Sequence, residues 1–190
     1  FEDQGLTTTE IIRTIDEVDR LGAENIIFSG GEPLLRTDIL EILHYAKQKI
    51  GDIDLCTNGT HLDSDMASSL AVELGEISIS LNGTKKRHDQ MCGTPGAFER
   101  TLRGIEVAVA AGLEVHLIMV VGAGMTAADF DEFMALVVEK LQVHSLSMLR
   151  LLPIGRGAGL KEHLVYRDDR KRYCSYVHNL RQRYLQFPIN

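Results

Sequence analysis

The sequence predicts an α/β fold in which a parallel sheet is covered by outer helices. Two observations carry this prediction: short apolar runs alternate with longer segments of helical periodicity, and the alternation continues along nearly all of the 190 residues. Strands that are each followed by a helix run parallel, because the helix returns the chain to the same end of the sheet. No repeat or proline-rich linker interrupts the pattern. We therefore expect residues 1–190 to form a single domain.

Six segments have the periodicity of amphipathic helices. In the first, Thr7 and Glu10 form a possible capping box, and Gly22 is a stop signal. The expected helices are residues 7–22, 37–46, 63–74, 98–112, 126–140 and 168–186.

Five shorter apolar runs are expected to be strands. The third alternates strictly, which puts Ser78 and Ser80 on one face and apolar residues on the other. The expected strands are residues 25–29, 53–57, 77–81, 114–121 and 145–152. Five strands are too few for a closed eight-stranded barrel, so an open sheet and an open barrel both remain.

Composition excludes several classes of protein. A formal net charge of -7 argues against binding to duplex nucleic acid. No apolar run is long enough to cross a membrane, and the polar first residues contain no signal peptide. The three cysteines, Cys56, Cys92 and Cys174, are far apart, which predicts a cytoplasmic protein without a disulfide framework. Because the chain begins at Phe1, we expect it to be part of a longer gene product.

Each expected strand leads into a loop that contains glycine. In parallel α/β folds, such loops at the carboxyl ends of strands hold the ligand. They are Ser29-Gly30-Gly31-Glu32-Pro33, Thr57-Asn58-Gly59, Ser80-Leu81-Asn82-Gly83, Gly122-Ala123-Gly124 and Pro153-Ile154-Gly155-Arg156-Gly157. Adjacent glycines allow the backbone to approach a ligand closely, and the Glu32 carboxylate suits a cationic ammonium group. The alternative is a glycine-rich turn with a solvated glutamate.

The ordered set of these loops, with His88-Asp89 and Gly96-Ala97-Phe98 behind the third, resembles the radical S-adenosylmethionine (SAM) superfamily. The resemblance covers residues 6–157. It is strongest to the branch that contains molybdenum-cofactor biosynthesis protein A and the peptide-modifying enzymes with a C-terminal cluster domain. It implies a six-stranded open (β/α) barrel whose first strand is missing from this chain.

The resemblance also implies a function and its cofactors. In the family, a CxxxCxxC loop after the first strand binds a 4Fe–4S cluster, and the reduced cluster cleaves SAM to a 5′-deoxyadenosyl radical that abstracts hydrogen from the substrate. The implied partners are a small-molecule or peptide substrate and a reductant protein such as flavodoxin or ferredoxin. Peptide or cofactor maturation is the implied setting. The exposed edge left by the missing strand would permit dimerisation.

Matching the family's motifs gives the expected SAM contacts. The glycines and Glu32 would meet the methionyl ammonium, Asn58 and Ser80 the ribose or carboxylate, and the loop after the last strand the adenine. The full expected set is Gly30, Gly31, Glu32, Pro33, Thr57, Asn58, Ser80, Asn82, Leu152, Pro153, Gly155 and Arg156.

The chain departs from the family in two places. No three cysteines have cluster spacing, so the cluster ligands are expected upstream of Phe1, and the fragment itself should be inactive. Cys92 stands where relatives have an arginine that pairs with the SAM carboxylate; Arg87 and Arg156 are possible substitutes. A non-catalytic SAM-binding or scaffold module and an ordinary barrel lyase or phosphate-binding enzyme remain alternatives.

Four polar segments have less specific interpretations. We expect residues 85–87 to be a solvated turn and His88-Asp89 to be a polar surface pair. His116 is expected to be hydrogen-bonded within the core rather than a metal ligand. Arg150 needs a partner within its apolar strand, and its placement inside the barrel or outside it stays open.

Overall fold

Five strands form one sheet in which every strand runs parallel to its neighbours. The computed structural model describes residues 5–153, 158–159, 164–165 and 167–190. The strands are β1 (Asn25–Phe28), β2 (Asp52–Thr57), β3 (Glu76–Ser80), β4 (Glu114–Val121) and β5 (Ser145–Arg150). They lie side by side in chain order. The predicted parallel α/β sheet is therefore confirmed.

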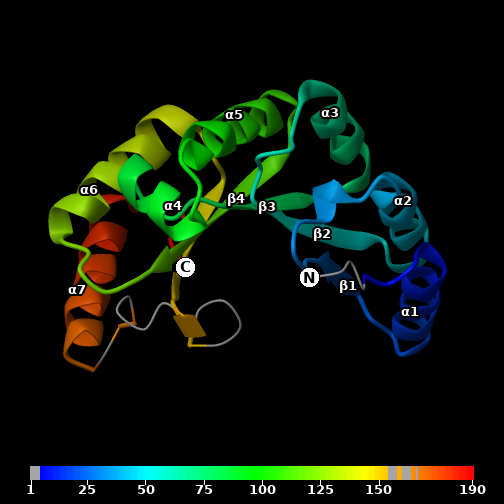
Figure 1. Ribbon diagram of the computed structural model, residues 1–190, viewed down its shortest axis with the longest axis horizontal. Helices are drawn as coiled ribbons and strands as arrows, with labels where there is room; N and C mark the ends of the chain where they lie inside the picture. The colour runs from blue at the N-terminus through cyan, green and yellow to red at the C-terminus, as the bar shows by residue number, and fades with distance from the viewer. Residues whose placement is uncertain (1–4, 154–157, 160–163, 166) are drawn as a thin grey trace.

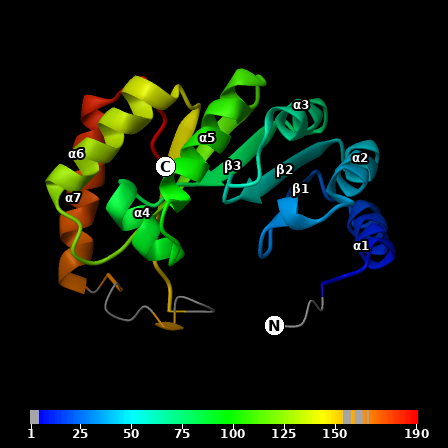
Figure 2. The same ribbon diagram turned by 45° about the horizontal axis from the view of Figure 1, so that its top comes forward.

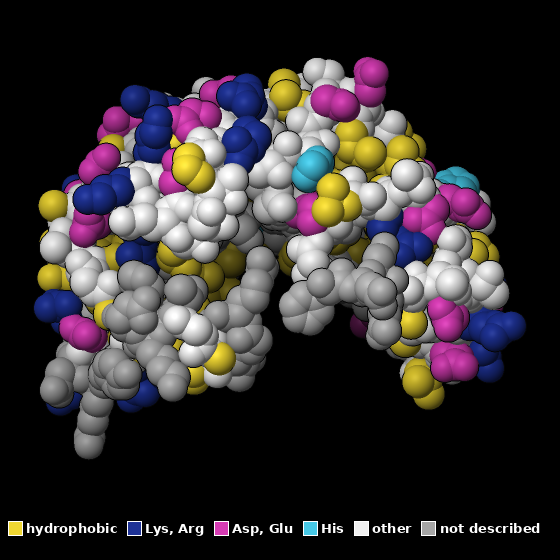
Figure 3. Space-filling model, viewed as in Figure 1, with side chains coloured by type: hydrophobic (Ala, Val, Ile, Leu, Met, Phe, Trp, Pro, Cys, Tyr) yellow, Lys and Arg dark blue, Asp and Glu magenta, His cyan; other side chains and the backbone are white. Residues whose placement is uncertain are grey.

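The helices lie along one side of a curved sheet (Figures 1 and 2). The α-helices are α1 (Thr8–Arg20), α2 (Ile39–Ile50), α3 (Ser64–Glu73), α4 (Lys85–Cys92), α5 (Ala97–Ala110), α6 (Ala127–Leu136) and α7 (Arg167–Arg183). Successive right-handed crossovers between neighbouring strands place the helices on the same face. The sheet bends into an arch (Figures 1 and 2), and Figure 3 shows the hollow between its two arms. Among the described residues, no helix has the length and apolar character that crossing a membrane requires.

The two faces of the sheet differ in polarity. On β2, Ile53 and Leu55 are fully buried beneath the helices, whereas Asp54 and Cys56 lie on the opposite, concave face. The strands are aligned so that the buried positions and the concave-face positions of β2 each continue into rows across the neighbouring strands. Cys56 is level with Ser78 of β3, which is level with His116 of β4.

Towards the amino-terminal end of the strands, the concave face carries a row of carboxylates. Asp54 is level with Glu76 of β3, which is level with Glu114 of β4. Asn25 of β1 donates from Nδ2 to both Asp54 (3.1 Å) and Asp52 (3.2 Å). Like charges directly opposite one another on a sheet are destabilising, so this row opposes the packing on the other face.

Two segments form structure that the periodicity did not indicate. Residues 85–92 form α4 rather than a solvated turn, and Gly93 ends this helix in the left-handed conformation at φ 65°. At the other end of the chain, Ile189 pairs in parallel with Leu146, supported by a hydrogen bond from Asn190 N to Leu146 O (2.8 Å). The C-terminal segment that contains Ile189 and Asn190, here called the tail, therefore covers part of the free edge of β5.

Candidate functional site

Three of the predicted ligand loops meet at one edge of the sheet. Residues 29–33 follow β1, residues 57–59 follow β2 and residues 80–83 follow β3. Because these strands are parallel neighbours, their carboxyl ends and the loops that follow lie side by side. Most of the expected SAM-binding residues are therefore brought together.

Glu32 ties the first two loops together. Its Oε1 accepts from Thr57 Oγ1 (2.5 Å) and from Leu34 N (3.2 Å), and its Oε2 accepts from Asn58 N (2.8 Å). The carboxylate thus caps the short 3-10 helix Pro33–Leu35 and fixes the end of β2. Three protein donors occupy much of the carboxylate's accepting capacity. Its demonstrated role is to hold the loops, and a contact with an ammonium group would have to use the remaining lone pair on Oε2.

The two glycines before Glu32 border open space. A Cβ added to Gly30 or to Gly31 would meet no protein atom within 4 Å. Gly30 has a φ of 152°, which other residues rarely adopt, whereas Gly31 has no such restriction. Packing within the protein therefore does not explain the absence of a side chain at Gly31. The open space suits a ligand that approaches the backbone.

The second loop is held by its own side chains and by α5. Asn58 Oδ1 accepts from both Thr60 N (2.8 Å) and Thr60 Oγ1 (2.6 Å), and Asn58 O accepts from Thr101 Oγ1 of α5 (2.9 Å). Gly59 is at φ 73°, and a Cβ on Gly104 of α5 would overlap its carbonyl oxygen. The Asn58 carboxamide oxygen is thus used within the turn.

The third loop connects β3 to β4 and α4. Asn82 Oδ1 accepts from Val120 N (2.9 Å), so this side chain extends the ladder between β3 and β4. Ser80 is half-buried on the concave face, level with Ile118. Of the two expected contacts, Ser80 is directed towards the hollow, whereas the oxygen of Asn82 is used inside the protein.

His88 is a structural residue that the sequence interpretation placed wrongly. It is 1% exposed rather than on the surface, and its Nδ1 accepts from Asn82 N (3.0 Å). Burial lowers its pKa, which favours the neutral ring that this acceptor role requires. Nε2 lies 3.4 Å from both Thr101 Oγ1 and Cys92 Sγ. The four-residue spacing of His88 and Cys92 was the available sequence signal, because it places both on one face of a helix.

Asp89 is half-buried at the surface, and its carboxylate also has a structural role. Its carboxylate accepts from Phe98 N and Gly96 N, both at 2.8 Å, at the start of α5. These two backbone bonds lower its pKa. His88 and Asp89 therefore do not act as an acid–base pair; each fixes a different neighbouring segment.

Comparison with known proteins identifies the family of this arrangement. The family model described as "Radical SAM superfamily" matches residues 2–137. The chain belongs to the radical SAM superfamily. An "AdoMet-dependent heme synthase" of Methanosarcina barkeri is 45% identical over 104 residues, which is 54% of this chain and 30% of the relative. "Mycofactocin maturase MftC" of Mycobacterium ulcerans is 31% identical over 160 residues, which is 84% of this chain and 43% of the relative.

A solved structure gives the same fold. Streptococcus suis SuiB bound to S-adenosylmethionine superimposes with a TM-score of 0.82 at 16% identity, covering 100% of this chain and 44% of SuiB. At that identity the likeness concerns the fold alone. The chain spans less than half the length of each of these relatives.

The loops after β1, β2 and β3 have open backbone but no set of ligands for an iron–sulfur cluster in the described residues. Within the described residues, no group of three histidines, cysteines or carboxylates could hold a metal ion. Burial raises the pKa of the Cys56 thiol, which disfavours the thiolate that iron requires. The backbone at Gly30 and Gly31, in contrast, borders space that no described protein atom within 4 Å would fill.

Cys92, which stands at the expected arginine position, and Arg87, one of the two possible substitutes, have different surroundings. Cys92 is exposed and lies beside His88. Burial lowers the pKa of Arg87, and the charges of Tyr173 on α7 and Asp129 on α6 partly oppose this shift. Its Nε and Nη2 are buried and have no hydrogen-bond acceptor in the described part of the chain.

The loop after β5 is described only in part. Leu152 and Pro153 are exposed at the carboxyl end of the last strand. Gly155 and Arg156, also predicted to bind SAM, lie outside the described residues.

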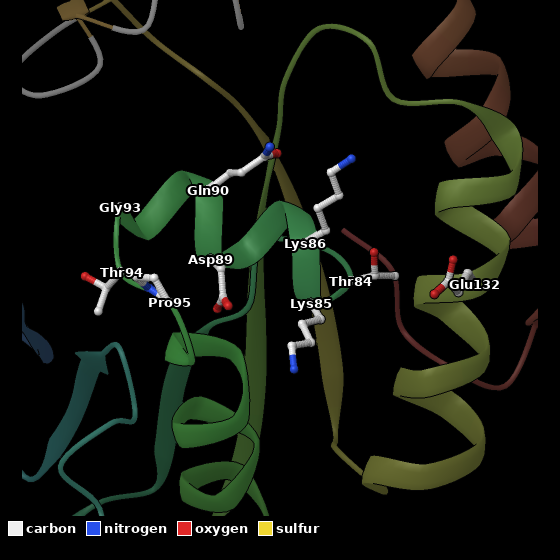
Figure 4. A pocket seen from close by; sticks show the side chains of 9 residues that line it. All are labelled: Thr84, Lys85, Lys86, Asp89, Gln90, Gly93, Thr94, Pro95 and Glu132. Atoms are coloured by element: carbon white, nitrogen blue, oxygen red, sulfur yellow. The ribbon is translucent and has the colours of Figure 1, made fainter.

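A groove of about 750 Å³ beside α4 is separate from these loops (Figure 4). It runs along the face of α4 that carries Lys85, Lys86 and Gln90, and Glu132 of α6 borders it. Lys85 is ion-paired with Glu99 of α5. Of the predicted SAM-binding residues that the structure describes, none lines this groove.

Proposed function

We propose that the intact protein binds SAM across the loops that follow β1, β2 and β3. The observation that carries this proposal is the open space above Gly30 and Gly31, whose backbone is held in place by the Glu32 bonds to the β2 loop. The backbone of these glycines would face the methionyl ammonium. Ser80 and the Asn58 amide nitrogen would face the ribose or the carboxylate.

The remaining predicted residues have supporting roles. Pro33, Thr57 and Asn82 would fix the loops, since each is engaged in local structure. The segment from Leu152 to Arg156 would border the adenine. A 4Fe–4S cluster would require cysteines upstream of Phe1, because the described residues do not supply its ligands.

The proposed reaction of the intact protein is reductive cleavage of SAM to a 5′-deoxyadenosyl radical, which abstracts hydrogen from a substrate. Maturation of a peptide or of a cofactor is the proposed setting. Relatives named as a mycofactocin maturase and as heme synthases support both choices. The 190-residue chain alone would be inactive.

The proposed partners follow from the same assignment. A flavodoxin or ferredoxin would supply the electron in the cytoplasm, and the chain's net charge of -7 disfavours nucleic acid. The outer edge of β1 has no strand beside it in the described residues. This edge would pair with the first barrel strand of the intact protein or, in the 190-residue chain, with a second copy.

The test compares two glycine variants of the intact protein. In Gly31→Ala the new methyl group would meet no protein atom, so stability should stay within about 0.5 kcal/mol while SAM affinity falls about tenfold or more. Gly75→Ala is the matched control. Its Cβ would also have room, but it lies before β3, at the opposite end of the strand.

Calorimetry measures SAM binding, and 5′-deoxyadenosine is quantified after anaerobic reconstitution and reduction. A variant with the upstream cysteines changed to alanine is the chemical control. If Gly31→Ala binds SAM as well as Gly75→Ala does, the proposed binding site is wrong. If SAM binds at this site but a reconstituted cluster does not cleave it, the non-catalytic SAM-binding module replaces the enzyme.

A further inference from the structure

A second cavity lies between β5 and α7. It has a volume of about 470 Å³, and we call it the β5–α7 groove. Its lining combines basic and apolar side chains: Arg150, Arg170, His178, Arg181, Leu149 and Val177. Cavities of this size are typical of small-molecule sites. The loops after β1, β2 and β3 contribute no residue to it.

The described side chains that line the β5–α7 groove are basic or uncharged. No acidic residue is among the described residues that line it. In the part of the chain that the structure describes, Arg150, Arg170 and His178 take part in no ion pair. Other arginines of α7 are paired on their own surfaces, Arg172 with Asp169 and Arg183 with Asp131. Within the described residues, cations without an ion-pair partner therefore gather between α7 and β5, in a protein whose net charge is -7.

Two hydrogen bonds make the groove a fixed feature. Arg181 Nε donates to Ile189 O (2.7 Å), which joins α7 to the tail that pairs with β5. Tyr173 Oη donates to Gly122 O (3.2 Å) at the end of β4. Because Tyr173 is buried, its ring forms a rigid apolar wall. The groove is thus shaped by α7, β5 and the tail together.

Strand register puts Arg150 on the face of β5 opposite the concave face, while Leu149, level with Val120, also borders the groove. His116 makes hydrogen bonds to Ser145 Oγ (2.5 Å) and Ser147 Oγ (3.0 Å), so these serines belong to the concave face. Alternation along β5 puts Arg150 on the opposite face. This answers the open question about Arg150: it lies outside the barrel interior, exposed at the groove.

We propose that the β5–α7 groove binds an organic anion, a small molecule with an apolar body and at least one carboxylate. Arginines that lack a carboxylate partner can each offer two parallel donors to a ligand carboxylate. Leu149, Val177 and the Tyr173 wall would cover the apolar body. The site is additional to the proposed SAM site and does not depend on it.

The test uses the intact protein and two probes that differ mainly in charge, 2-naphthoate and 2-naphthalenemethanol. Titration by ligand-observed NMR should show tighter binding of naphthoate, weakened by salt. The double variant Arg150→Gln/Arg170→Gln should weaken naphthoate binding about tenfold and leave the alcohol unchanged. Arg103→Gln, an exposed arginine of α5 away from the groove, is the matched control and should bind as the parent does.

Three results would overturn the proposal. Equal binding of the acid and the alcohol would show an apolar groove without anion recognition. No binding of either probe would show that another part of the intact protein covers the groove. Arginine-dependent binding of an acidic peptide, but not of naphthoate, would make it a docking site for a protein segment. SAM cleavage measured on the same variants tests the proposed function separately, because neither arginine belongs to the SAM loops.

Discussion

Glu32 shows how one side chain can hold two loops of a site. Its carboxylate accepts from Thr57 Oγ1, Leu34 N and Asn58 N. We expect Glu32→Gln to lower the free energy of unfolding by about 1–3 kcal/mol, because the new amide group would face a donor that then lacks an acceptor. Denaturant titration measures the change.

Glu24→Gln is the control for this substitution, since Glu24 is exposed and has no hydrogen-bond partner among the described residues. If Glu32→Gln is as stable as Glu24→Gln, the three bonds to the carboxylate do not stabilise the fold.

His88 should make stability depend on pH. Burial holds its pKa in the folded protein below the ordinary histidine value of about 6.5. The unfolded chain therefore takes up the proton first as pH falls, and stability is lost progressively below about pH 6.5. The slope for this one group approaches at most about 1.4 kcal/mol per pH unit.

Urea titrations of the parent and of His88→Gln between about pH 7.5 and pH 5 measure this dependence. The variant should be less stable at neutral pH and should lack the histidine slope. His144→Gln, which removes an exposed ring, should keep it. An unchanged slope in His88→Gln would assign the pH dependence to other groups.

At the scale of residues, the sequence located the loops better than the roles of their side chains. Gly30 and Gly31 were recognisable because two glycines directly follow an apolar run. The partner of Glu32 could not be recognised from the sequence, because Thr57 is twenty-five positions away and only the sheet brings it close. His88 was misjudged since its acceptor role depends on the backbone of Asn82.

At the scale of elements, α5 lies unusually close to the loop after β2. A Cβ at Gly104 would overlap the carbonyl oxygen of Gly59, so only glycine permits this approach. We expect Gly104→Ala to destabilise the protein by about 1–3 kcal/mol through overpacking. This loss occurs although alanine favours helices more than glycine does.

Gly104→Ala should also weaken SAM binding. The added methyl group would displace the loop after β2, and Asn58 of that loop would face the ligand. Thermal unfolding and calorimetry on the intact protein measure the two effects. Gly75→Ala again serves as the control with room for its methyl group. A Gly104→Ala protein with parental stability would contradict the close approach.

Periodicity predicted the elements that bury a long apolar face and missed those that do not. Helix α4 has one buried residue, His88, and a strongly polar sequence. No apolar stripe therefore distinguished it from a solvated turn. The pairing of Ile189 with Leu146 was missed for a different reason, since a single bridge leaves no alternation to detect.

At the scale of the whole molecule, the position of each strand in the sheet should determine its local stability. Strands β3 and β4 have neighbours on both sides, whereas β1 has one. In the 190-residue chain we expect amide hydrogens of β3 and β4 to exchange about a hundredfold more slowly than those of β1. Hydrogen exchange with mass spectrometry measures this difference.

Hydrogen exchange repeated at several protein concentrations is the control for dimerisation, because pairing of two β1 edges would slow exchange in β1 as the concentration rises. Uniform protection of all five strands at low concentration would contradict the expected gradient. The parallel sheet followed from the sequence, since strands that alternate regularly with helices run parallel, whereas the order of the strands did not, because an open sheet and an open barrel share the same alternation. The curvature of the sheet into an arch came instead from the family resemblance.

The row formed by Asp54, Glu76 and Glu114 affects how charged molecules approach the hollow. Three carboxylates lie at its amino-terminal mouth, whereas at the opposite mouth the Glu32 carboxylate accepts three hydrogen bonds and lies among glycines and hydroxyl groups. An anionic molecule is repelled at the first mouth and meets no such barrier at the second. We therefore expect negatively charged compounds to approach the hollow more readily from the side of the loops that follow β1, β2 and β3 than from the amino-terminal side.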